Sequence, residues 1–145
     1  MGHFYIDPEI EARNYGIEVC PDSRLDHGIN GMIEKTENGI VIKYDPDMHP
    51  NRQRFTVAHE LGHYVCGHLQ DKPMFRDSRK NFSLENYDIY EVEANRFAAN
   101  LLMPKEKIDF MLYKEGITSI DKMAQLLRVS PAAMTYRLQN LGYIS

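Results

Sequence analysis

Two histidines four residues apart, in the stretch VAHELGHYVCGH at 57–68, constrain the fold of this chain more than any other feature. Asn51 can cap a helix at the start of this region, and Gly67 can end it. Side chains four residues apart share one face of a helix, so His59 and His63 can bind the same metal ion. We therefore expect a partly buried helix that presents two imidazoles from one side.

Glu60 completes a His-Glu-x-x-His pattern with the two histidines. Random placement of the histidines and glutamates in this chain would give about 0.02 such matches, so chance explains the pattern poorly. Glu60 is turned by about 100° from His59 around the helix. That offset suits a base that reaches a water beside the metal better than it suits a third ligand.

The third ligand has to come from another part of the chain, because a catalytic zinc ion takes three protein ligands and keeps one position open. The position six residues after the second histidine is Leu69, and His68 points away around the helix, so we assign His68 a structural or supporting role. Glu91 is the better donor, because Asn95 shares its face and can accept a hydrogen bond from a ligating histidine. Glu93 is the rival ligand, since Glu91 and Glu93 cannot both face the metal.

Helices and short strands account for the rest of the chain. The pattern of caps, turns and apolar residues predicts a helix from Asp7-Pro8 to Gly16, a strand at 17–19, a hairpin at 31–45 with a type I′ turn at Asn38-Gly39, a long loop at 69–88, helices at 89–103 and 105–115, and two short helices that begin after Ser119 and Ser130.

Composition limits the class of protein. With a net charge of -4, the chain as a whole has no positive electrostatic field that would attract nucleic acid. Cys20 and Cys66 form no CxxC pair and are expected to be reduced thiols. The N-terminus lacks the basic and apolar regions of a signal peptide, and no apolar run approaches the roughly 18 residues of a membrane helix. We expect a soluble, cytoplasmic protein without a membrane partner.

HELGH followed at this distance by E-x-EAN-x-FAA-x-LLMP resembles the ImmA/IrrE group of zinc metallopeptidases. The likeness includes Arg76-Asp77 and extends to VSPAAMTYRLQNLG at 129–142, so it covers roughly residues 8–143. HELGH alone is moderately specific, whereas HELGH combined with FAANLLMP at 97–104 is highly specific.

The resemblance implies an α+β fold in which a small antiparallel sheet packs on helices to form a zincin-like catalytic core. We expect this core at 1–115 and a small helix-turn-helix-like subdomain packed on it at 116–145. The resemblance also implies one zinc ion per chain. It implies His59, His63 and Glu91 as the ligands and Glu60 as the general base.

The activity implied by the resemblance is the cleavage of a regulatory protein, often a helix-turn-helix repressor of a mobile element or of a stress response. Zinc would polarise the scissile carbonyl and activate water, and Glu60 would pass the proton to the leaving amine. Tyr87, Tyr90 and Tyr136 are the candidates to stabilise the oxyanion, and the sequence does not choose among them. Asn95 stands where Asp is common in gluzincins, and a neutral amide does less to raise the basicity of a histidine.

Two other functions compete with proteolysis. A DNA-binding regulator would use residues 116–145, which carry three cationic side chains against one acidic side chain, a net charge of +2. A helix that opens with Pro131-Ala-Ala-Met134 has no polar side chain at its start that could form hydrogen bonds to base edges. We therefore favour packing or substrate recruitment over DNA contact for this segment. A non-hydrolytic zinc-bound protein-interaction module would use the same ligands, but it would not need Glu60.

Overall fold

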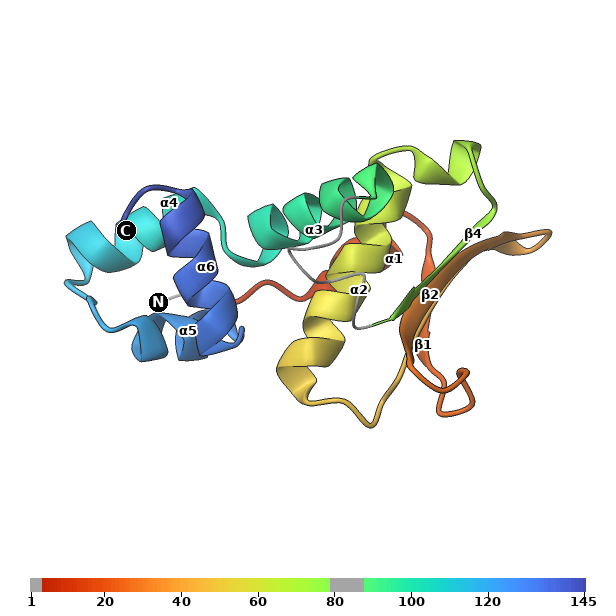
Figure 1. Ribbon diagram of the computed structural model, residues 1–145, viewed down its shortest axis with the longest axis horizontal. Coiled ribbons are helices and arrows are strands. Elements are labelled where there is room, and N and C mark those ends of the chain that lie inside the picture. The colour runs from red at the N-terminus through yellow and green to blue at the C-terminus, as the bar shows by residue number, and fades with distance from the viewer. Residues whose placement is uncertain (1–3, 79–87) are drawn as a thin grey trace. The chain divides into compact units, whose positions relative to one another are not determined.

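The computed structural model describes residues 4–78 and 88–145 (Figure 1). The chain divides into two compact units: Asp7–Ala98, and Ala99–Ser145 together with the described part of Met1–Ile6. The boundary that the sequence suggested, between 1–115 and 116–145, stays a prediction. No helix among the described residues is long and apolar enough to cross a membrane.

The unit Asp7–Ala98 contains a four-stranded sheet. Its strands are β1 (Glu18–Pro21), β2 (Ile29–Thr36), β3 (Gly39–Tyr44) and β4 (Met74–Ser78), in the order β1-β3-β2-β4. The predicted α+β class is confirmed. The sheet is mixed instead of wholly antiparallel, because β1 pairs with the second strand of the hairpin, β3, which runs in the same direction as β1.

The hairpin between β2 and β3 is present, but its turn differs from the prediction. Asn38 does not have the positive φ that a type I′ turn requires, since Arg128 is the one non-glycine residue with positive φ in the described chain. The Thr36 hydroxyl donates to the Gly39 carbonyl at 2.7 Å and accepts from the Asn38 N–H at 3.1 Å. A side chain therefore closes this turn in place of the expected backbone geometry.

Strand β4 lies where the sequence predicted part of a loop, so that prediction is wrong for residues 74–78. Phe75 and Asp77 are buried, whereas Met74 and Arg76 are exposed. This alternation is that of a strand with one buried face, but an aspartate stands in one of the two buried positions. Because Asp77 is polar, the sequence of this segment does not show the alternation of apolar and polar residues by which a half-buried strand is predicted.

Three α-helices and a short 3-10 helix at His68–Gln70 complete the described part of this unit; the α-helices are α1 (Pro8–Asn14), α2 (Pro50–Val65) and most of α3 (Ile89–Leu102). Asp7 caps α1 as expected, because its carboxylate accepts from the Glu9 N–H at 3.0 Å. The cap of α2 is His49 and not Asn51; its Nδ1 accepts from the Asn51 N–H at 3.1 Å. Helix α2 packs against α1, β2 and β3, and all of its residues from 56 to 63 are buried.

Helices α2 and α3 approach each other closely at Gly62. A Cβ atom at this position would lie 2.9 Å from the Ala94 carbonyl oxygen and 3.2 Å from Cβ of Phe97. Ala94 is fully buried. The glycine of HELGH therefore allows α3 to lie against the helix that carries the two histidines.

The second unit is helical. It contains α4 (Lys105–Asp109), a π-helical turn at Phe110–Lys114, α5 (Ile120–Leu127) and α6 (Pro131–Asn140). Ser119 and Ser130 cap α5 and α6 as predicted, accepting from the backbone N–H groups of Lys122 and Ala133. The core of this unit is apolar and includes Met111, Met123, Leu127, Met134 and Leu138.

Replacement of Gly62 tests the helix contact. We expect Gly62→Ala to lower the free energy of unfolding by about 1–3 kcal/mol, because the added methyl group overpacks the contact with α3. Alanine would otherwise favour the helix by about 1 kcal/mol. Urea unfolding followed by circular dichroism measures the change, with Val65→Ala on the more exposed end of α2 as control. A stabilised Gly62→Ala protein would contradict the proposed close contact.

Candidate metal centre

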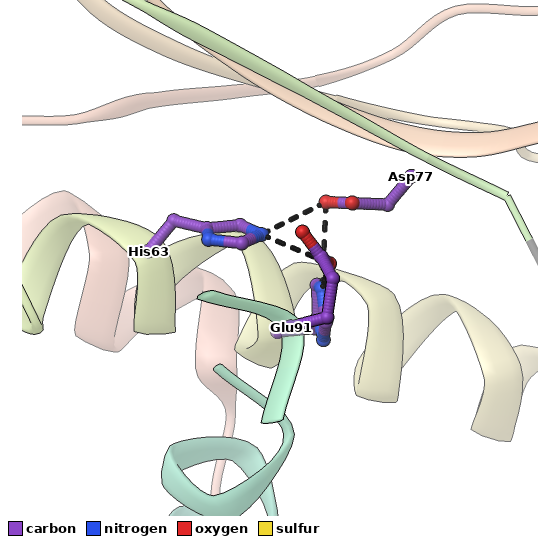
Figure 2. Close-up of side chains that lie close together, drawn as sticks. His63, Asp77 and Glu91 are labelled. Atoms are coloured by element: carbon purple, nitrogen blue, oxygen red, sulfur yellow. Dashed lines mark hydrogen bonds and ion pairs between the residues drawn. The ribbon is translucent and has the colours of Figure 1, made fainter. Parts of the chain in front are cut away.

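Four buried side chains from three elements converge on one point. Figure 2 shows His63 of α2, Asp77 of β4 and Glu91 of α3 directed toward one another. Oε1 of Glu91 lies 2.9 Å from Nε2 of His59 and 3.4 Å from Nε2 of His63. Oδ2 of Asp77 lies 3.4 Å and 3.0 Å from the same two nitrogens. The four donor atoms all lie within 4.8 Å of one another.

These spacings fit a small metal ion. Zinc binds nitrogen and oxygen donors at about 2.0–2.2 Å, which places neighbouring ligand atoms of a tetrahedral site about 3.3 Å apart. The four separations between a histidine Nε2 atom and a carboxylate oxygen run from 2.9 to 3.4 Å. Two imidazoles and carboxylates suit zinc, and they also accept manganese, iron or cobalt.

Asn95 lies behind His59. Its Oδ1 atom is 2.7 Å from Nδ1 of His59, a contact between α2 and α3 that the spacing of Glu91 and Asn95 predicted. With Nε2 of His59 directed at the cluster, Nδ1 carries a proton and donates a hydrogen bond to the amide oxygen of Asn95. The contact fixes both the tautomer and the orientation of the ring.

His63 is held by a different chain of contacts. Its Nδ1 atom lies 2.9 Å from Nδ1 of His68, and Nε2 of His68 lies 2.7 Å from Oε1 of Glu93. With Nε2 of His63 directed at the cluster, Nδ1 of His63 donates to His68, and His68 donates to Glu93. Glu93, the rival ligand from the sequence, thus faces His68. The ring of His63 also stacks on Phe75, with ring centroids 4.1 Å apart.

Glu60 is fully buried, and neither of its carboxylate oxygens accepts a hydrogen bond from a donor among the described residues. Burial raises the pKa of Glu60 well above 4.5, and the charge of Asp77, a side-chain hydrogen bond to Asp77 and the charge of Glu91 raise it further. A Cβ atom at Gly31 of β2 would lie 3.3 Å from Oε2 of Glu60, so the sheet comes close to this carboxyl group. A buried carboxyl group that accepts no hydrogen bond is costly, and such a group is typical of a site that binds something.

The histidines and carboxylates of the cluster shift one another's protonation. Burial lowers the pKa of His59, but hydrogen bonds to Asp77 and Glu91 outweigh it and raise the pKa to about 9. Burial raises the pKa of Asp77, but hydrogen bonds from His59 and His63 hold the pKa well below its ordinary value. A bound cation would replace the proton on His59 as the partner of these carboxylates.

The three tyrosines proposed to stabilise the oxyanion have different surroundings. Tyr87 lies outside the described residues. The Tyr90 hydroxyl donates to Oδ2 of Asp71 at 3.0 Å, and this hydrogen bond raises the pKa of Tyr90. Tyr136 lies on α6, in the other compact unit.

Asp77 is the member of the cluster that sequence reasoning missed. It lies in a segment predicted as loop, and its spacing from HELGH gives no helical signal. The available signal was the Phe75-Arg76-Asp77 alternation, together with the presence of Arg76-Asp77 in the family likeness. The likeness singles out Arg76-Asp77 as a pair, but it indicates neither the strand nor the buried face on which Asp77 lies.

An α+β fold in which a His-Glu-x-x-His helix lies against a second helix that carries a glutamate is that of a zincin-like metallopeptidase. Residues 12–139 match the peptidase M78 family, described as the IrrE N-terminal-like domain. The chain belongs to this metalloprotease family.

Three relatives and one solved structure extend the comparison. The chain is 34% and 32% identical to the radiation response metalloproteases IrrE of Deinococcus deserti and Deinococcus radiodurans, over 66% and 75% of its length. It spans 37% and 33% of those two proteins. It is 31% identical to "Uncharacterized immunity region protein 2" of Bacillus phage phi105, over 86% of this chain and 74% of that protein. A Mycobacterium tuberculosis transcriptional regulator shares the fold, with a TM-score of 0.62 at 18% identity over 91% of this chain and 39% of that one.

Metal content distinguishes the two candidate glutamates. We expect about one zinc per wild-type chain after dialysis against a weak chelator, and a loss of most of it in Glu91→Ala, because a donor atom is removed. Glu93→Gln should retain the metal, since Glu93 faces His68. Atomic absorption on the three proteins measures this. Zinc kept by Glu91→Ala and lost by Glu93→Gln would reverse the assignment.

The contact between His63 and His68 makes a separate prediction. We expect His68→Phe to weaken zinc binding by about 10- to 100-fold, because His63 loses the acceptor that orients its ring. Competition with a chromogenic chelator gives the dissociation constant, and Tyr90→Phe, which alters another neighbour of His68, is the control. An unchanged constant in His68→Phe would show that the contact does not support the ligand.

Proposed function

We propose that the chain is a zinc-dependent peptidase that hydrolyses peptide bonds of a regulatory protein. His59, His63 and Glu91 would hold one ion per chain, and Glu60 would be the general base. The observation that carries the proposal is the Glu60 carboxyl group, which is fully buried, accepts no hydrogen bond from the described residues and neighbours the converging donor groups. When bound, the ion supplies a Lewis acid that polarises a carbonyl group and makes water more acidic.

The chain's own residues perform the remaining steps of the proposed reaction. Glu60 accepts the proton of the attacking water at a carboxylate oxygen and delivers it to the leaving amine. Its oxygens can accept this proton because no described residue donates a hydrogen bond to them. Asn95 holds the ring of His59, and His68 with Glu93 holds that of His63, so both imidazoles keep Nε2 toward the ion.

We propose a helix-turn-helix repressor of a mobile element or of a stress response as the substrate, encountered in the cytoplasm. The names of the relatives support this class: two are radiation response metalloproteases, and one is an immunity region protein of a phage. The phage relative is matched over most of its own length, so the likeness extends beyond the motif.

DNA binding is the weaker alternative, because two of the three cations in 116–145 are engaged within their own unit. The Arg128 guanidinium lies 3.7 Å from the centroid of the Tyr5 ring. Nε of Arg137 donates to the Met103 carbonyl at 2.9 Å. A non-hydrolytic zinc-bound module is also less favoured, because it would not need the general base that the buried Glu60 would provide.

Glu60→Gln tests the proposal. We expect the variant to keep its zinc and to cleave at least about 100-fold more slowly, because the amide cannot accept the proton. Candidate repressors are incubated with each protein, and products are quantified by mass spectrometry. Glu106→Gln, an exposed change on α4, is the control and should cleave like wild type. Equal rates for Glu60→Gln and wild type would show that Glu60 is not the base.

A further inference from the structure

Asp77 has the same relation to the two histidines as Glu91. The Glu91 oxygen lies 2.9 and 3.4 Å from the two Nε2 atoms, and the Asp77 oxygen lies 3.4 and 3.0 Å from them. Asp77 is also as deeply buried as Glu91, with 1% of its surface exposed against 4%. The geometry that makes Glu91 a ligand therefore makes Asp77 one as well.

A fourth protein ligand changes what the site can do. A tetrahedral ion with four protein ligands has no position left for water, as in structural zinc sites, whereas a catalytic ion keeps one position open. Glu60 can act only on a water that reaches the ion. An aspartate at the fourth position therefore excludes the reactant on which Glu60 depends.

We propose that Asp77 is a fourth protein ligand, that this conformation is a latent form of the metal site, and that Asp77 must withdraw before the ion can bind water or substrate. The inference rests on the proposed function of the His59, His63 and Glu91 set. It adds a ligand, and with it a form of regulation that acts at the ion itself.

The strand that carries Asp77 is suited to such a change. Among the described strands, β4 is at the edge of the sheet and pairs with β2 alone. The β2–β4 ladder is irregular at this end, because Asp77 pairs with Gly31 and Ser78 pairs with Ile29, with a register shift between them. Two residues earlier, Phe75 stacks on His63 and anchors the strand. A displacement confined to the end of β4 would release Asp77 and leave the histidines in place.

Two measurements on the zinc-loaded protein test the proposal without relying on catalysis. The first is zinc affinity, by competition with a chromogenic chelator. The second is calorimetric binding of acetohydroxamate, which requires an open position on the ion. We expect Asp77→Ala to bind zinc at least tenfold more weakly than wild type. Once loaded, it should bind acetohydroxamate at least tenfold more tightly.

Asp77→Asn provides a second variant of nearly the same shape, in case the smaller side chain prevents folding. Its amide is a weaker ligand, so both constants should shift in the same directions. Arg76→Ala is the matched control, because Arg76 is the neighbouring residue on β4 and its exposed side chain pairs with Asp26. Its two constants should equal those of wild type.

The outcomes separate this inference from the proposed function. If wild type and both Asp77 variants bind zinc and acetohydroxamate equally, Asp77 is not a ligand and the latent form is wrong, while the proposed peptidase site stands. If the Asp77 variants bind zinc normally but bind acetohydroxamate more tightly, Asp77 acts beside the ion and the fourth-ligand assignment is overturned. If wild type takes up no zinc, the metal site and the inference both fail.

Discussion

The close contact between Gly62 of α2 and Ala94 of α3 is the constraint on which the candidate metal centre depends. Because position 62 has no side chain, the backbone of α3 lies against α2 one residue before His63. Glu91 and Asn95, on either side of Ala94, then reach His59 at 2.9 and 2.7 Å. A methyl group at this point would press the two helices apart where the distances between the candidate donor groups are set.

The cluster compensates in part for its own burial. Three fully buried groups on α2, namely His59, Glu60 and His63, would each be costly without partners. The histidines find partners at both ring nitrogens, in Glu91, Asp77, Asn95 and His68. Glu60 accepts no hydrogen bond, and its ionisable neighbours Asp77 and Glu91 disfavour its charged form. The burial of Glu60 is therefore the least compensated of the three.

The sequence predicted the parts of this site that follow helical spacing. His59 with His63, and Glu91 with Asn95, are i, i+4 pairs, and the structure brings the two pairs together. It did not predict Asp77. This residue reaches the site through the pairing of its strand with β2, and such a pairing gives no residue spacing relative to HELGH that could be recognised in the sequence. The parallel pairing of β1 with β3 escaped prediction for the same reason, since it joins segments separated by the hairpin. The turn at Asn38 was misjudged because the Thr36 hydroxyl provides the hydrogen bonds expected of the backbone.

The elements that hold the four donor groups differ in how firmly they are fixed. His59, His63 and Glu91 come from two helices whose crossing leaves no room for another atom at Gly62. Asp77 comes from an edge strand, near a register shift. Each histidine ring has an additional contact behind it, from Asn95 or from His68. Of the four groups, we therefore expect Asp77 to be the one that can leave with the least disturbance to the other three donor groups.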